Sequence, residues 1–138
     1  MPKKLLLPLL LTAVLAGCAS PATPPAAADA QHNARLSLDW AGTYRGLLPC
    51  ADCAGLETTV VLRQDQTYHL QTRYIGKGGQ VDNQAGVFDW GPEGRTVTLP
   101  GPAPEHYFVG EGWLLRLASD GSRISGPLAD HYRLNKLD

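Results

Sequence analysis

Two closely spaced cysteines are the side chains of this sequence with the clearest capacity for chemistry. They are Cys50 and Cys53, in the stretch 49-PCADCAG-55. Thiols at this spacing form a redox couple, half of a metal site, or a small disulfide that shapes a turn. A thioredoxin-type couple requires its first thiol at the start of a helix, but here a strand pattern begins just after Gly55. Because Asp52 between the cysteines would also oppose a thiolate, catalytic disulfide exchange is disfavoured.

Metal binding by this pair is limited by the shortage of other ligands. A structural zinc site needs four protein ligands, and the pair supplies only two. Copper(I) prefers soft sulfur ligands, so the two cysteines could hold it, with a histidine as a third ligand. The candidate histidines are scattered along the chain: His69, His106 and His131. The remaining hypothesis is a disulfide in an oxidising compartment, which closes a small loop and stabilises the fold by roughly 2 kcal/mol.

The third cysteine, Cys18, ends a segment that is typical of secretion. Lysines precede the apolar run 5-LLLPLLLTAVLA-16, which is too short to span a bilayer as a permanent helix. The run leads into 15-LAGC-18, which resembles the lipobox of bacterial lipoproteins. We therefore expect residues 1–17 to be a signal peptide and Cys18 to carry a lipid. The residues after Cys18 lack the aspartate associated with inner-membrane retention, which favours the periplasmic side of the outer membrane.

The segment that follows Cys18 differs in composition from the rest of the chain. Residues 18–35 are dominated by alanine and proline with some serine and threonine, and they have little to bury. Such a segment cannot offset the entropy of ordering, so we expect a flexible tether. The folded domain is expected at residues 36–138.

Charge and motif content exclude several classes of function. The chain has 12 basic and 13 acidic residues, a net charge of −1, and no local run of Lys or Arg. Nucleic-acid binding is therefore not expected, because it requires a basic face. No Gly-rich phosphate loop is present and no serine nucleophile with partners can be assembled. We assign no catalytic residues and predict that the protein is not an enzyme.

Apolar residues alternate with period two over most of the chain after residue 40, which predicts strands. The stretches 57–63 and 67–75, joined by the polar turn 64–66, predict a hairpin. Further strands are expected at 40–48, 84–90, 95–99, 106–110, 113–118, 124–128 and 131–136. We find no convincing amphipathic helix. These eight or nine strands form an antiparallel meander, which avoids free edges by closing into a barrel.

A barrel of about eight strands is filled by side chains or holds one small ligand. Its inward aromatic side chains would include Tyr68, Tyr74, Phe88 and Trp90. An alternative function is therefore a lipocalin-like carrier of a small apolar ligand.

Several stretches together resemble the N-terminal domain of the NlpE family of outer-membrane lipoproteins. They are 40-WAGTYRGLLPCADCAGLETTVVLRQDQTYHL-70, 88-FDW-90, 113-WLLRL-117 and 132-YRLNK-136. The resemblance implies a lipocalin-like barrel, a lipidated Cys18, and the family's Cys-x-x-Cys at Cys50 and Cys53. It also implies a role in envelope-stress sensing or copper homeostasis, with a stress-sensor protein as partner and copper(I) as candidate ligand. The best-known members continue into an OB-fold domain with no counterpart in these residues, so only properties of the barrel are carried over.

Overall fold

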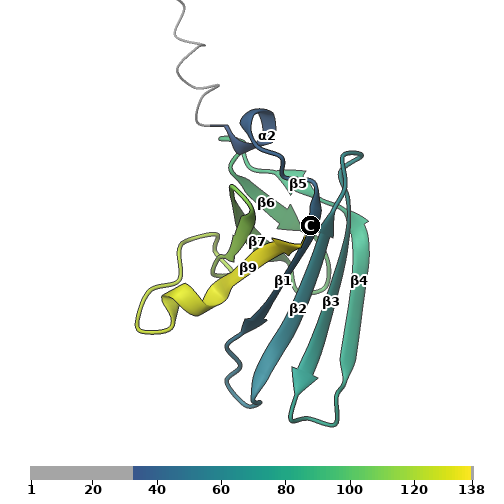
Figure 1. Cartoon of the computed structure of the whole chain (residues 1–138), viewed down its shortest axis with the longest axis vertical. Helices are drawn as coiled ribbons and strands as arrows, with labels where there is room; N and C mark the ends of the chain where they lie inside the picture. The colour runs from purple at the N-terminus through teal and green to yellow at the C-terminus, as the bar shows by residue number, and fades with distance from the viewer. Residues whose placement is uncertain (1–32, 138) are drawn as a thin grey trace, which may run out of the picture.

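A single antiparallel sheet organises the computed structural model, which describes residues 33–137. Its nine strands lie in the order β4-β3-β2-β1-β9-β8-β7-β6-β5. Each strand pairs with the next in sequence except β4 with β5, and β1 also pairs with β9 (Figure 1). The sheet thereby curls into a nearly closed barrel, so the predicted all-β meander is confirmed. The strands are β1 (Gly42–Leu48), β2 (Gly55–Leu62), β3 (Thr67–Ile75), β4 (Val81–Val87), β5 (Asp89–Trp90), β6 (Thr96–Leu99), β7 (Glu105–Gly110), β8 (Trp113–Arg116) and β9 (Arg133–Leu137).

The barrel interior is filled by large side chains. Tyr44, Tyr68, Tyr107 and Phe88 are all fully buried, together with leucines and valines from most strands. The Phe88 ring packs edge-to-face against Trp40, with ring centroids 5.8 Å apart. The hydroxyl of Tyr44 donates to the Trp40 carbonyl oxygen at 2.6 Å, so this buried polar group is satisfied.

The first and last strands of the barrel, β1 and β9, approach each other closely at Gly46. A β-carbon placed on Gly46 in β1 would lie 2.5 Å from the carbonyl oxygen of Arg133 and 2.8 Å from a methyl carbon of Leu134. Only glycine leaves room for β9 at this distance. The β1–β9 contact that curls the sheet therefore explains Gly46, the second glycine of the motif 40-WAGTYRG-46.

Side-chain hydrogen bonds connect the edge strand β4 and its neighbour β3 to Pro100, the residue after β6. The Gln84 amide nitrogen in β4 donates to the hydroxyl oxygen of Tyr68 at 2.7 Å and to the carbonyl oxygen of Pro100 at 2.9 Å. The Tyr68 hydroxyl donates to the same carbonyl. Apart from Gln84, every residue of β4 is exposed. The barrel is thus closed here by a few side-chain hydrogen bonds and not by a backbone ladder.

One predicted strand, at 124–128, was wrong. This part of the chain forms a turn and then the 3-10 helix η1 (Ala129–Tyr132), and its one isolated bridge joins Leu117 to Arg123. Gly126 has φ +102 and Pro127 has no N–H to donate, so neither residue suits an interior strand position.

The structure also differs from the predicted strand at 84–90. The observed strand β4 begins earlier, at Val81, and the strand is interrupted at Phe88. The Phe88 N–H donates to the Gln66 carbonyl oxygen in the β2–β3 turn, which separates β4 from β5.

A short helix that the sequence pattern did not predict opens the described chain. Helix α2 (Ala34–Ser37) begins after Asn33, whose side chain accepts a hydrogen bond from the Arg35 N–H. Ala34 is 6% exposed and belongs to the core, so the fold includes residues that we expected at the end of the tether. Neither α2 nor η1 has the length or apolar character needed to cross a bilayer. The expected signal peptide, residues 1–17, and most of the tether lie outside the described residues.

Candidate functional site

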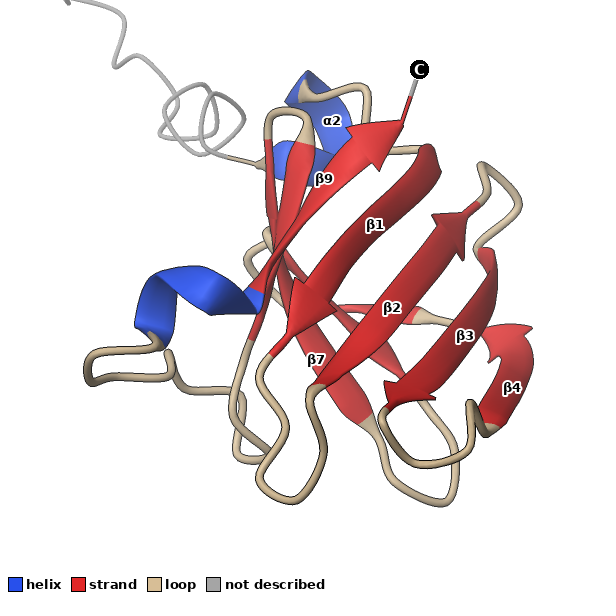
Figure 2. Ribbon diagram, turned by 60° about the horizontal axis from the view of Figure 1, so that its bottom comes forward, coloured by secondary structure: helices blue, strands red, loops and turns tan. Residues whose placement is uncertain are grey.

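A disulfide joins Cys50 to Cys53 in the loop between β1 and β2. The two Cα atoms are 5.3 Å apart, and both residues are partly exposed. The loop lies at the end of the barrel opposite helix α2 (Figure 2). Of the three predicted alternatives for the two cysteines, the disulfide is therefore the one present. It shapes a solvent-facing loop at one mouth of the barrel.

A second loop holds the disulfide loop through a charged contact. The Lys77 ammonium group, in the turn between β3 and β4, lies 2.5 Å from the Oδ2 atom of Asp52. The hydrogen bond and the positive charge of Lys77 lower the pKa of the Asp52 carboxyl group. The Ala54 N–H also donates to the carbonyl oxygen of Ile75 at 2.9 Å. The β3–β4 turn therefore fixes the disulfide loop by both a side chain and backbone.

Sequence reasoning missed Lys77 because it is 25 residues from Asp52. Along the chain, no basic residue lies within three positions of either cysteine. The signal that could have found Lys77 is the predicted hairpin of β2 and β3, in which Gly55 pairs with Ile75. That register places the turn after β3 beside the loop before β2.

The Cys50, Asp52 and Cys53 side chains form a potential metal-binding group, with ligand atoms that all lie within 4.8 Å of one another. In the oxidised pair the sulfur atoms carry no charge, so they do not fit copper(I), which is bound by thiolate. Reduction would free two thiolates beside the carboxylate. The group therefore fits copper(I) only in its dithiol form.

Only one of the three candidate histidines lies near the disulfide loop. His131 in η1 lines a surface cavity of about 220 Å³ whose other walls include Pro49 and Ala54, the residues on either side of the disulfide. His106 lies on β7, where its Nδ1 atom is 3.0 Å from the Thr98 hydroxyl. His69 lies in β3 and pairs with Val61 and Ala85 on the adjacent strands.

A group of polar side chains lies inside the barrel near the same mouth. The Glu105 carboxylate lies 3.0 Å from a guanidinium nitrogen of Arg116 and accepts a hydrogen bond from Tyr107. Burial, and then the Glu105 charge, raise the pKa of Tyr107 well above its ordinary value. Desolvation and a hydrogen bond to Asp82 raise the pKa of Tyr74. A cavity of about 160 Å³ opens beside these groups, between β3, β4 and the start of β7.

The filled interior does not favour the alternative function, in which the barrel carries a small apolar ligand. Of the four aromatic side chains expected to face inward, Tyr68 and Phe88 are fully buried in the core and Trp90 packs against it. Tyr74 lies at the mouth, on the polar cavity. Protein side chains thus occupy the interior that an apolar ligand would need, and the cavity at the mouth is lined by charged and amide groups.

The fold and site define a class of protein: a small antiparallel barrel that carries a disulfide loop at one mouth. A family model described as the NlpE N-terminal domain matches residues 44–127, more than half of the chain, and the chain belongs to this family. The match includes both cysteines of the loop and most of the strands.

Solved structures agree with this assignment. A crystal structure described as a lipoprotein from Shewanella oneidensis is 43% identical, with a TM-score of 0.71 over 75% of this chain and 94% of that chain. The crystal structure of the Cpx pathway activator NlpE from Escherichia coli is 27% identical, with a TM-score of 0.51 over 62% of this chain and 46% of that chain. The sequence is also similar to lipoprotein NlpE of Escherichia coli strain K12, 40% identical over 48 residues. That match covers 35% of this chain and only 20% of the curated relative.

Proposed function

We propose that the protein is a non-enzymatic, lipid-anchored barrel of the NlpE type that senses envelope stress from the periplasmic face of the outer membrane. The observation that carries the proposal is the disulfide loop of Cys50 and Cys53, exposed at the mouth of a barrel of this family and held by Lys77. The similar Escherichia coli protein is described as a Cpx pathway activator, which supports a stress-signalling role.

The loop has the properties of a redox-responsive contact surface. A dithiol reductant would supply two electrons and two protons, convert the disulfide to two thiols and itself become a disulfide. The backbone between Cys50 and Cys53 would then lose its covalent constraint, while Asp52 would keep its contact with Lys77. A stress-sensor partner that reads the shape of this loop would distinguish the two states.

The stress-sensing proposal is tested with a stress-response reporter in a Gram-negative host that expresses the full chain. We expect overexpression to activate the reporter and Cys50→Ser/Cys53→Ser to change that activation. A suitable control is Ser119→Ala, since Ser119 is exposed and lies in the loop after β8. Unchanged activation by the double cysteine variant would show that the disulfide loop has no role in signalling.

The lipid anchor is tested independently by mass spectrometry of the membrane fraction after thiol alkylation. We expect an N-terminal fragment that starts at Cys18 with diacylglyceryl and acyl groups, and an unalkylated Cys50–Cys53 pair. The Cys18→Ser chain should leave the outer-membrane fraction. If that chain still fractionates with the outer membrane, lipidation of Cys18 is not what anchors the protein.

Copper homeostasis is a second candidate, because reduction would place two thiolates and the Asp52 carboxylate within one cluster. We expect one copper(I) per reduced chain, measured by competition with a chromophoric copper(I) chelator, and no binding by Cys50→Ser/Cys53→Ser. His131→Ala tests the nearest histidine, and His69→Ala is its matched control. Equal copper(I) binding by the double cysteine variant would refute this role.

A further inference from the structure

Two stacked aromatic rings, each in contact with an arginine side chain, lie on the outer surface of β7, β8 and β9. The rings of Phe108 and Trp113 are stacked, with centroids 5.7 Å apart. The guanidinium carbon of Arg123 lies 4.5 Å from the centroid of the Phe108 ring, and that of Arg133 lies 4.8 Å from the centroid of the Trp113 ring. We call these four residues the arginine–aromatic face.

The strands beneath this face hold its aromatic pair in place. Phe108 alternates along β7 with buried Tyr107 and Val109, so its ring lies outside the barrel. A β-carbon on Gly110 would lie 2.2 Å from the Trp113 indole, so the absence of a side chain there lets the indole lie against β7. The two rings therefore form a flat support that is built into the sheet.

The two guanidinium groups on this support have no carboxylate partner among residues 33–137. Neither Arg123 nor Arg133 forms an ion pair there, whereas Arg45, Arg73 and Arg116 each contact a glutamate. An arginine that stacks on a ring keeps its in-plane N–H groups directed away from the ring. Those donors match the oxygen atoms of a phosphate group. The face is therefore suited to an anionic partner.

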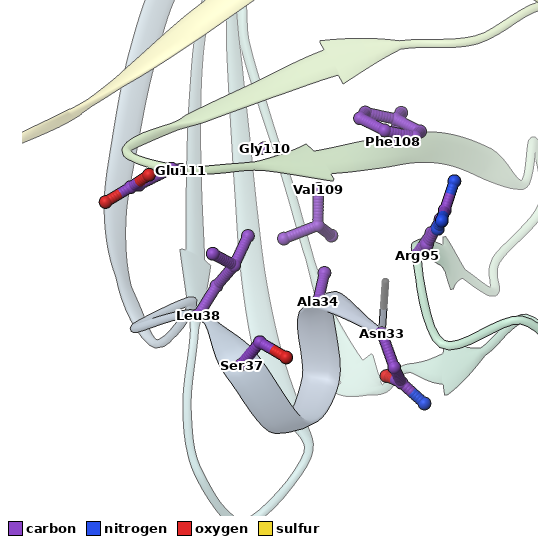
Figure 3. A pocket seen from close by; sticks show the side chains of 9 residues that line it. All are labelled: Asn33, Ala34, Ser37, Leu38, Arg95, Phe108, Val109, Gly110 and Glu111. Atoms are coloured by element: carbon purple, nitrogen blue, oxygen red, sulfur yellow. The ribbon is translucent and has the colours of Figure 1, made fainter. Parts of the chain in front are cut away.

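Apolar groups lie beside the arginine–aromatic face, at the end where the chain enters the domain. Phe108 also lines a cavity of about 340 Å³ that helix α2 borders, with Leu38 and Val109 among its walls (Figure 3). Asn33, the first described residue, lies at this cavity too. Leu36 in α2 is 73% exposed, so an apolar side chain projects into solvent on this helix.

We propose that the arginine–aromatic face docks the barrel sideways on an anionic phospholipid surface, in addition to the proposed lipid anchor on which this inference rests. Residues 19–32 separate Cys18 from Asn33, a length of chain that spans at most roughly 50 Å, so the anchor holds the domain close to the headgroups. Arginine binds lipid phosphates, and tryptophan is enriched at the level of the headgroups. The exposed carboxylate of Glu111 beside the cavity opposes this attraction.

The test is binding of the unlipidated chain from Ala19 onward to vesicles. All nine strands and the core lie within residues 34–137, so this chain keeps the fold. Vesicles contain equal parts of phosphatidylethanolamine and phosphatidylglycerol, or phosphatidylcholine alone. We expect binding only to the anionic vesicles, weakening as salt is added. Arg123→Gln/Arg133→Gln should weaken it roughly 25-fold, because each basic residue near an anionic surface contributes about fivefold. Glu111→Gln should strengthen it.

The matched control is Arg45→Gln/Arg73→Gln, which removes the same charge from exposed arginines on β1 and β3. We expect this control to weaken binding much less than Arg123→Gln/Arg133→Gln does, since the single charge of Glu57 offsets one of its two arginine charges and neither arginine belongs to the arginine–aromatic face. Arg123→Lys/Arg133→Lys keeps the charge but loses the planar stacking, and should weaken binding partially. Circular dichroism verifies that each variant is folded.

Several outcomes would overturn the proposal. They are no binding to anionic vesicles at low salt, equal weakening by the two glutamine double variants, and binding to soluble polyglutamate but not to vesicles, which would indicate an acidic polypeptide as the partner. Because the tested chain lacks Cys18, none of these outcomes depends on the lipid anchor. Failure of the anchor proposal would appear in the mass spectrum of the membrane fraction and in the fractionation of the Cys18→Ser chain.

Discussion

The carbonyl oxygen of Arg133 lies 2.5 Å from the position that a β-carbon on Gly46 would occupy. Gly46→Ala should therefore push β9 away from β1 and lower the free energy of unfolding by about 3 kcal/mol, because the obstructing atom is backbone and cannot rotate away. Urea denaturation measures this. Gly78→Ala is the control: nothing lies within 4 Å of its β-carbon, so only the strain of its left-handed backbone, about 1 kcal/mol, is expected. Equal losses in the two variants would contradict the close approach.

Removal of the disulfide should have a small effect on stability. Cys50→Ala/Cys53→Ala opens a loop that links residues separated by only three positions, which lowers the free energy of unfolding by about 2 kcal/mol at most. The far-UV circular dichroism spectrum should be unchanged, since the strands are held by their own ladders and core. A variant that is unfolded at neutral pH would show that the disulfide has a larger structural role than its position indicates.

Loss of the Lys77 contact should change the ionisation of Asp52. In Lys77→Gln the pKa of the Asp52 carboxyl group should rise toward its ordinary value, because its hydrogen-bond donor and neighbouring positive charge are gone. An NMR titration of the carboxyl carbon measures this. Negatively charged glutathione should also reduce the disulfide about two- to fivefold more slowly, since the loop becomes more negative. An Asp52 pKa that does not move would show that the contact is absent in solution.

Alkaline pH should destabilise the protein through its buried tyrosines. Burial, and then the charge of Asp39, raise the pKa of Tyr44 to about 12 from 10.0. The unfolded chain loses this proton at lower pH than the folded chain, so the stabilisation is complete below pH 10 and is lost as pH rises toward 12. The loss amounts to about 3 kcal/mol.

Urea denaturation at a series of pH values measures this dependence. Tyr107, whose pKa is also raised, should add to it. Tyr44→Phe should be less stable at neutral pH by about 1 kcal/mol, because the hydrogen bond to Trp40 is lost, yet its stability should fall less steeply between pH 10 and 12. If the stability of both proteins fell equally steeply between pH 10 and 12, the dependence could not be assigned to Tyr44.

The sequence pattern predicted those parts of the fold in which one face of a strand is buried. In the stretch 57–63 the period-two alternation predicts a shared face for Thr58, Val60 and Leu62, and all three are buried in β2. The pattern failed at 124–128, where the alternation of apolar residues was outweighed by the turn chemistry of Gly126 and Pro127. It also misplaced the start of β4, because a strand exposed on both faces has no apolar alternation to detect.

The candidate site was predicted only to the extent that it is local in sequence. The disulfide of Cys50 and Cys53 followed from their spacing and from the expected oxidising compartment. Its charged partner Lys77 did not, since that contact depends on how the β3–β4 turn lies against the loop. The stacking of Arg133 on Trp113 likewise joins different strands, and it could be found only once their register was known.

The exposed position of β4 has a consequence for how the native protein opens. Only one backbone ladder, with β3, joins this strand to the barrel, and across the gap on its other side the Gln84 side chain donates a hydrogen bond to the carbonyl oxygen of Pro100. Detachment of β4 therefore exposes almost no core, in contrast to loss of β1, which is paired on both sides. Amide protons of β4 should exchange with solvent through a local opening well below the global unfolding free energy, whereas those of β1 and β2 exchange only when the whole barrel unfolds.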